Sequence, residues 1–165
     1  MNYRTTAFLL LPALAGCGHT HKLANNPLTL LLGHRTDTGT FFVDGRQFPV
    51  SNNSLCEMVG DTTAVTCRGD DGTHFAWLDI FSWDPKTGQI TKTSLGTIPG
   101  ERPSEMTGAY DTTTRTLSLK GVQRLTDGTE LPVRSLQTFT DDGMTLKFFV
   151  TKNGEEQMTL DIVKR

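Results

Sequence analysis

Apolar and polar residues alternate in short runs along most of the chain, from Gly39 to the C-terminus. Runs such as 75–83 (FAWLDIFSW), 144–150 (MTLKFFV) and 157–163 (QMTLDIV) are rich in Thr, Val and aromatic residues, as β-strands are. Between the runs lie turn sequences such as Asp44-Gly45 and Asp127-Gly128, which supply positive φ angles or local hydrogen bonds. The pattern predicts about nine or ten strands joined in succession by hairpins.

So many strands with one apolar face must remove their exposed edges, and closing the sheet does so. We therefore expect an all-β fold, an up-and-down antiparallel barrel. One segment, 26–33 (NPLTLLLG), predicts a short N-terminal helix, with Asn26 as N-cap, Pro27 at the first position and Gly33 as the C-terminal stop. This helix is expected to plug one end of the barrel.

The last hairpin has an apolar face that predicts its register. A three-residue loop, Asn153 to Glu155, would place three apolar pairs on the inner face: Val150 with Met158, Phe148 with Leu160, and Leu146 with Ile162. The residues between them would then face water, namely Lys147, Thr151, Thr159 and Asp161.

The spacing of two cysteines indicates a disulfide. A tight turn through residues 60–63 would place Cys56 opposite Cys67 and Met58 opposite Val65, within bonding distance for the cysteines. Closing so short a loop contributes about 3 kcal/mol to stability in the chain-entropy model. A redox or metal-binding role for this pair is the alternative interpretation.

The N-terminus predicts export. Arg4 precedes an apolar run, Ala7 to Ala15, that is too short for a membrane span but typical of a signal-peptide core. The run ends in Leu14-Ala15-Gly16-Cys17, which resembles the lipobox of bacterial lipoproteins. The resemblance implies a signal peptide over 1–16 and a lipid-modified Cys17; the alternative is an ordinary signal peptide with an incidental cysteine. Gly18, where inner-membrane lipoproteins carry Asp, implies an outer-membrane location facing the periplasm.

The predicted organisation has three parts: the signal peptide, a lipidated cysteine and flexible tether over 17–27, and a single barrel domain over 28–165. More than one acyl chain on Cys17 would give stable anchoring, since each buried methylene contributes about 0.8 kcal/mol. His19 and His21 form an HxH pattern, which we interpret as part of a solvated linker; two ligands on a mobile segment make a weak metal site.

Charge narrows the choice of partners. The net charge is −2 and the isoelectric point is near 6.1, so there is no basic field to attract nucleic acid. The expected partners are the membrane through its lipid anchor, a small apolar ligand, or another envelope protein.

Turn-centred segments resemble an uncharacterised bacterial family with a lipocalin-like (calycin) barrel. They are Leu30 to Gly33, Trp83 to Gly88, Thr107 to Asp111, Asp127 to Pro132 and Phe139 to Gly143. The resemblance spans most of 30–165 and implies a barrel, without an agreed activity. Family members usually have Gly-Thr-Trp after the opening helix, whereas this chain has Gly33-His34-Arg35.

The run 75–83 carries the best candidate site. Its odd positions share one face of the strand: Phe75, Trp77, Asp79, Phe81 and Trp83. A carboxylate amid aromatic rings would orient a polar or cationic ligand in an apolar pocket. In the alternative interpretation, Asp79 pairs with an Arg or Thr of the next strand and the aromatic rings fill the core.

Catalytic chemistry has little support in the sequence. Outside the tether, His34 and His74 are the histidines, so no catalytic triad is visible, and no histidine follows His74 to ligate haem. Asp70-Asp71-Gly72 lacks the glutamate of a calcium loop and is interpreted as a turn. We expect no catalytic residues, metal or cofactor, and predict that the protein is not an enzyme.

Two functions from different classes remain. The first is a lipid-anchored barrel that binds a small apolar or amphipathic ligand, with the odd face of 75–83 as its wall. The second is a solid-cored envelope module that acts through protein-protein interaction. An interior void of several hundred Å³ lined by those five side chains would favour the first, and a filled core would favour the second.

Overall fold

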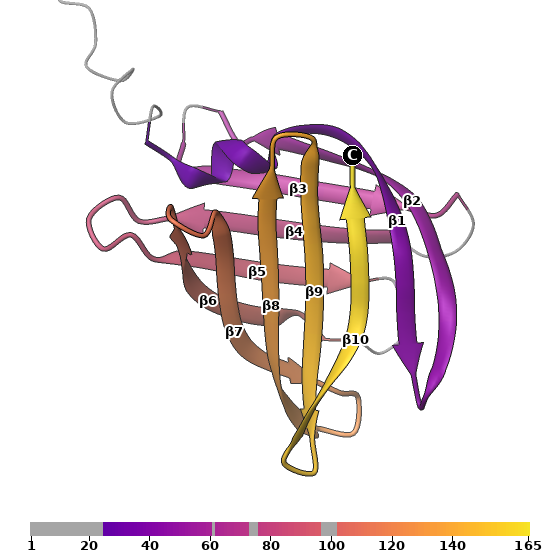
Figure 1. Ribbon diagram of the computed structural model, residues 1–165. Helices are drawn as coiled ribbons and strands as arrows, with labels where there is room; N and C mark the ends of the chain where they lie inside the picture. Colours follow the sequence, from indigo (N-terminus) through magenta and orange to yellow (C-terminus); the bar gives the residue numbers. More distant parts are fainter. Residues whose placement is uncertain (1–24, 61, 73–75, 97–101) are drawn as a thin grey trace, which may run out of the picture.

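The computed structural model describes residues 25–60, 62–72, 76–96 and 102–165, and they form a closed barrel of ten antiparallel strands (Figure 1). Each strand pairs with its neighbours in sequence, and the last pairs with the first. The expected all-β, up-and-down barrel is confirmed. Its elements are the 3-10 helix η1 (Pro27–Leu31) and the strands β1 (Gly33–Val43), β2 (Arg46–Met58), β3 (Ala64–Asp70), β4 (Ala76–Trp83), β5 (Ile90–Gly96), β6 (Ser104–Asp111), β7 (Thr116–Arg124), β8 (Glu130–Thr140), β9 (Gly143–Lys152) and β10 (Glu155–Lys164).

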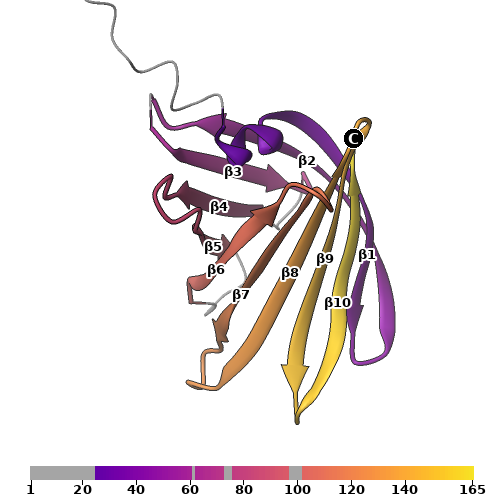
Figure 2. The same ribbon diagram turned by 60° about the vertical axis from the view of Figure 1, so that its left-hand side comes forward.

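The barrel closes where β1 meets β10, with Asp37 opposite Lys164 and Phe41 opposite Leu160. Figure 2 shows β8, β9, β10 and β1 forming one continuous side of the barrel. Gly39 lies in this seam, and a Cβ atom there would lie 2.0 Å from the carbonyl oxygen of Asp161. Only glycine therefore allows the two backbones to approach this closely.

The first hairpin is longer than the sequence pattern indicates. Strand β1 begins at Gly33, before the alternation at Gly39, and pairs with β2 from Gly33 opposite Cys56 down to Val43 opposite Arg46. Its two-residue turn has positive φ at Asp44 (47°) and Gly45 (75°). These angles match the twist of the flanking strands, which is why Asp-Gly is favoured here.

The last hairpin corrects one predicted pair. Phe148 lies opposite Leu160 and Leu146 opposite Ile162, as expected, but Val150 lies opposite Gln157 and not Met158. The loop contains two residues, because Asn153 (φ 55°) and Gly154 (φ 81°) both adopt positive φ and Lys152 pairs with Glu155. The residue that the predicted three-residue loop would have contained belongs to β10, where an irregularity between Met158 and Leu160 accommodates it.

The N-terminal helical segment forms a 3-10 helix, shorter than the predicted segment 26–33. The Asn26 side chain accepts a hydrogen bond from the Leu28 amide, as an N-cap does, and Pro27 occupies the first turn. Leu28 and Leu31 are each 1% exposed and join the hydrophobic core. Gly33, the predicted stop, has φ 109° and begins β1. The helix packs against β3 and β4, so it covers the end of the barrel at which the chain enters.

Candidate functional site

The inner face of β4 carries the predicted wall residues. Phe81 is 2% exposed, and Trp77 and Trp83 pack against the same core cluster. The indole of Trp77 lies against Gly69 of β3, where a Cβ atom would be only 2.7 Å from the ring. Phe75 lies outside the described residues. The described aromatic wall residues therefore belong to the barrel interior, as the parity of the strand indicates.

Asp79 is held by the neighbouring strand β5. Its Oδ2 lies 2.9 Å from Lys92 Nζ, and its Oδ1 accepts a hydrogen bond of 2.5 Å from the Ser94 hydroxyl. Ser94 is directly opposite Asp79 in the ladder, and Lys92 is two residues away on the same face. Asp79 thus pairs with the next strand, but through Lys and Ser rather than Arg or Thr.

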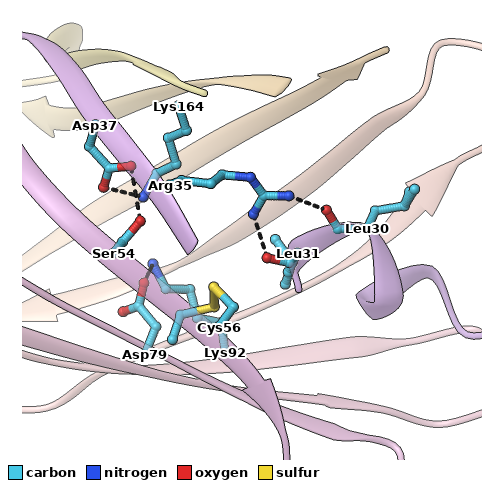
Figure 3. Close-up of a disulfide and its surroundings, with 10 residues drawn as sticks. Leu30, Leu31, Arg35, Asp37, Ser54, Cys56, Asp79, Lys92 and Lys164 are labelled. Carbon is cyan, nitrogen blue, oxygen red and sulfur yellow. Dashed lines mark hydrogen bonds and ion pairs between the residues drawn. A yellow bond between two sulfur atoms is a disulfide. The ribbon is translucent and has the colours of Figure 1, made fainter. Parts of the chain in front are cut away.

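A second buried ion pair joins the two ends of the barrel sheet. Lys164 Nζ of β10 lies 2.7 Å from Oδ2 of Asp37, which is completely buried on β1. The Ser54 hydroxyl of β2 donates to the other oxygen, Asp37 Oδ1, at 3.0 Å. All three side chains point into the barrel (Figure 3).

The two ion pairs form one electrostatic cluster. Burial lowers the pKa of the Lys164 ammonium; the carboxylates of Asp37 and Asp79 oppose that shift, while the positive charge of Lys92 adds to it. Lys164 Nζ also lies 4.8 Å from the ring centroid of Trp77. We call Asp37, Asp79, Lys92 and Lys164, with Ser54 and Ser94, the charged cluster.

Two buried polar atoms on the inner face of the barrel have no hydrogen-bond partner among the described protein atoms. They are Oδ1 of Asn52 on β2 and the hydroxyl of Ser135 on β8. Asn52 lies opposite Asp37 in the ladder and is 8% exposed, and Ser135 is fully buried. A buried polar group without a hydrogen-bond partner costs about 1–3 kcal/mol of stability. The presence of two such atoms on the inner face therefore needs an explanation.

The predicted disulfide is present beside the charged cluster. Cys56 and Cys67 lie opposite each other in the β2–β3 ladder, are bonded, and are both buried on the inner face. Cys67 is also the ladder partner of Asp79. Met58 lies opposite Val65, as expected. The disulfide therefore links the strands that separate the two ion pairs.

One barrel end is closed by η1. Arg35 of β1 donates to the carbonyl oxygen of Leu30 at 2.8 Å and to that of Leu31, and so holds the C-terminal end of the helix (Figure 3). Burial is the main cause that lowers the pKa of this guanidinium. This pKa shift does not change the charge of Arg35, because an arginine stays protonated at any physiological pH.

The opposite end has exposed apolar residues on its inner face. Phe41 and Phe48 lie opposite each other in the β1–β2 ladder, in parity with Asp37 and Asn52, yet they are 40% and 47% exposed. Val43 is 40% exposed beside them. Along β2, the inner positions Cys56, Ser54 and Asn52 are buried, Val50 is partly exposed and Phe48 is exposed. We call Phe41, Val43 and Phe48 the apolar rim.

Inner positions on other strands become more accessible toward the same end. On β10, Ile162 is buried and Leu160 only partly so, and on β9 Met144 is buried while Phe148 and Val150 are partly exposed. The inner face is therefore closed near η1 and solvent-accessible near the apolar rim. A depression of about 460 Å³ at this end, lined by Arg102, Pro103, Glu105 and Arg124, contains none of the predicted wall residues.

Three residues of the charged cluster were not predicted from the sequence: Asp37, Lys92 and Lys164. The signal was available for the two lysines: Lys92 shares its face with Ile90 and Ser94, and Lys164 shares its face with Leu160 and Ile162. A charge at an inner position of an alternating strand is unusual and needs a partner. No sequence signal marked Asp37, because polar residues surround it in β1.

The remaining predicted residues lie apart from this cluster. His34 is exposed on β1, and Asp70 accepts a hydrogen bond from the Gly72 amide in a turn, as expected. Cys17, His19, His21 and His74 lie outside the described residues.

Within the described part of the chain, no group of three His, Cys, Asp or Glu side chains has metal-binding geometry. Across that same part, no helix has the length and apolar character needed to cross a bilayer.

Comparison with known proteins adds no family assignment. A scan against protein-family models finds no match for this chain, and a search of the curated proteins finds none either. The resemblance to a lipocalin-like bacterial family therefore stands on the sequence motifs alone, and function must be argued from the geometry of the barrel interior.

Proposed function

We propose that this protein binds a small amphipathic molecule inside its barrel, with the polar end of the ligand at the charged cluster and its apolar part toward the apolar rim. The observation that supports this proposal is the charged cluster itself, which lies on the inner face of a barrel whose described inner positions become more exposed toward the apolar rim. Small-molecule sites typically combine an apolar wall with a few fixed polar groups, and this interior has both.

A purely structural role accounts poorly for the cluster. Buried ion pairs contribute little net stability, and replacing them with apolar residues of similar volume is often neutral or stabilising. Here two pairs adjoin each other, and the unpaired Asn52 and Ser135 atoms lie on the same inner face. Polar groups that stability does not require are better explained by binding. The activity that we propose for them is binding rather than catalysis.

The proposal places this barrel in the bacterial cell envelope. The lipobox-like sequence ending in Cys17 supports a lipid anchor, and Gly18 supports the outer membrane with the barrel in the periplasm. The disulfide between Cys56 and Cys67 agrees with this, because such bonds persist in oxidising compartments.

The alternative function is a protein-binding module of the envelope. The observation in its favour is the apolar rim, since exposed apolar side chains at a hairpin tip are also typical of protein interfaces. The rim residues face inward by strand parity, however, which suits a barrel entrance better than an outer docking surface.

Native mass spectrometry of the protein, extracted gently from its own envelope, tests the proposal. We expect a retained small molecule on the wild-type barrel. The double variant Phe41→Ser/Phe48→Ser should lose it, with affinity lowered on the order of 10-fold or more, since each partly buried ring contributes about 1 kcal/mol. Ile80→Ser is the matched control, because Ile80 is 39% exposed on the outer face of β4.

Three outcomes separate the hypotheses. Loss of the retained mass in the rim variant alone supports ligand binding. A protein partner that co-purifies with the wild type and is lost in the rim variant supports the interaction module. An empty wild-type barrel, with no thermal stabilisation by any amphiphile tested, contradicts ligand binding.

A further inference from the structure

The carboxylates and the lysines of the charged cluster differ in how many of their hydrogen-bonding groups have partners. Both oxygens of Asp37 accept a bond, one from Ser54 and one from Lys164. Of the two Asp79 oxygens, Oδ1 accepts a hydrogen bond from Ser94 and Oδ2 forms the ion pair with Lys92. Each of the four carboxylate oxygens therefore already faces one protein donor.

The lysines, by contrast, keep donors to spare. An ammonium group has three N–H donors. Among the described residues, Lys92 and Lys164 each have one carboxylate partner, and Lys164 otherwise faces the Trp77 ring. Both lysine side chains are 7% exposed, so bulk solvent gives little compensation. The buried hydroxyl of Ser135 is a further donor without a partner. Among the described residues, each of the two ammonium groups thus has more N–H donors than ion-pair partners.

The electrostatic interaction between the two lysines also favours an anionic ligand. Lys92 and Lys164 lie close enough for the charge of one to act on the other. The two pairs lie near each other, with the Ser54 hydroxyl between them in the view of Figure 3. An anionic oxygen that reaches both ammonium groups would accept from both and offset their mutual repulsion.

We propose that Lys92 and Lys164 together bind the oxyanion head group of a single-chain amphiphile, a carboxylate or a phosphate, whose alkyl chain extends toward the apolar rim. This inference rests on the proposed function and specifies the ligand class. Asp37 and Asp79 hold the two ammonium groups in place and keep the empty site neutral. Trp77 and Phe81 form the adjoining apolar wall, since the lysines lie 4.8 Å and 5.6 Å from their ring centroids.

Titration calorimetry with four ligands that share one alkyl chain tests the head-group assignment: dodecanoate, dodecyl phosphate, dodecanol and dodecyltrimethylammonium. We expect at least one of the two anions to bind about 10- to 100-fold more tightly than dodecanol, the range expected for charge-assisted hydrogen bonds. The cationic ligand should bind more weakly than dodecanol. Which anion binds more tightly distinguishes a carboxylate ligand from a phosphate.

Paired substitutions keep the fold while removing the donors. Asp79→Asn/Lys92→Met and Asp37→Asn/Lys164→Met each remove a whole ion pair, so no buried charge is left uncompensated. Either should remove most of the preference for the anion over dodecanol. The control Lys147→Met/Asp161→Asn removes an exposed pair, 3.9 Å apart on the outer face of β9 and β10, and should leave all four affinities unchanged.

The outcomes are distinguishable from those of the proposed function. If dodecanol and the anions bind equally and the paired variants change nothing, the head-group assignment is wrong although ligand binding stands. Tighter binding of the cationic ligand would also overturn it and would assign the head group to the aspartates. If none of the four ligands binds a barrel shown to be folded by its disulfide and circular dichroism, both this inference and the proposed function fail.

Discussion

At the scale of single residues, the barrel interior differs from a simple apolar core. Asp37 is completely buried and depends on Lys164 and Ser54 for its hydrogen bonds. A buried carboxylate without its cation is costly, whereas removal of both charges is tolerated. The pair is therefore coupled: each member is needed mainly because the other is present.

The single variant Lys164→Met should lower the free energy of unfolding by about 3–5 kcal/mol, because it leaves the Asp37 carboxylate uncompensated. The double variant Asp37→Asn/Lys164→Met should lose far less and stay within about 1 kcal/mol of the wild type. Urea unfolding followed by circular dichroism measures both. A double variant as unstable as the single one would show that lost packing, and not the stranded charge, causes the effect.

Sequence reasoning found the residues of this interior only where they interrupt a strongly apolar strand. Asp79 was identified because four aromatic residues share its face in 75–83. Lys164 follows the same inner face of β10 but lies at its end, where a charge is ordinarily solvated. Its burial depends on closure of β10 against β1, a contact between residues 127 positions apart, which local patterns cannot report.

At the scale of elements, turn sequences predicted the pairing of the β2–β3 hairpin correctly. They failed in the last hairpin, where a two-residue loop and a three-residue loop both fit the apolar pattern. The β2–β3 hairpin has the register that the cysteine spacing indicates. In the last hairpin, the Asn153-Gly154 turn is two residues long, and the extra residue moves to an irregularity near Met158. The alternation of apolar residues is the same in either arrangement beyond that point, so the sequence pattern alone did not distinguish them.

One side chain of β1, Arg35, forms hydrogen bonds with the C-terminal end of the helix η1. Arg35→Met should remove both hydrogen bonds to the carbonyl groups of Leu30 and Leu31 and loosen the closed end. We expect amide exchange at Leu32 to become about 10-fold faster, in line with the loss of a charged hydrogen bond, while global stability changes less. Arg68→Met is the control, because Arg68 is exposed and pairs with Glu57 at 3.4 Å. Equal exchange in both variants would mean that η1 is held by Leu28 and Leu31 alone.

At the scale of the whole molecule, the two barrel ends differ. The chain enters at the end that η1 covers, and the apolar rim lies at the other. A protein anchored through Cys17 would therefore carry its membrane attachment on the closed side and its entrance on the far side. The barrel architecture was predictable from regular alternation and turns, whereas this polarity was not, because it depends on which inner residues closure leaves uncovered.

The anchor itself is tested by Cys17→Ser. Without the thiol there is nothing to acylate, so the variant should move from the membrane fraction to the soluble fraction on ultracentrifugation of cell lysates. Mass spectrometry of the wild-type N-terminus should show acyl chains on Cys17. A wild-type protein that is already soluble would show that the lipobox-like sequence marks an ordinary signal peptide.

The seam between β1 and β10 has a consequence for how the protein is made. Because the first and last strands must meet before Asp37 and Lys164 can pair, the contact that completes the interior has one of the largest sequence separations in the fold. Such contacts form slowly, since the whole intervening chain must first be ordered. A nascent chain still lacking its final strand cannot form this seam, so the proposed binding site is complete only when β10 has joined β1.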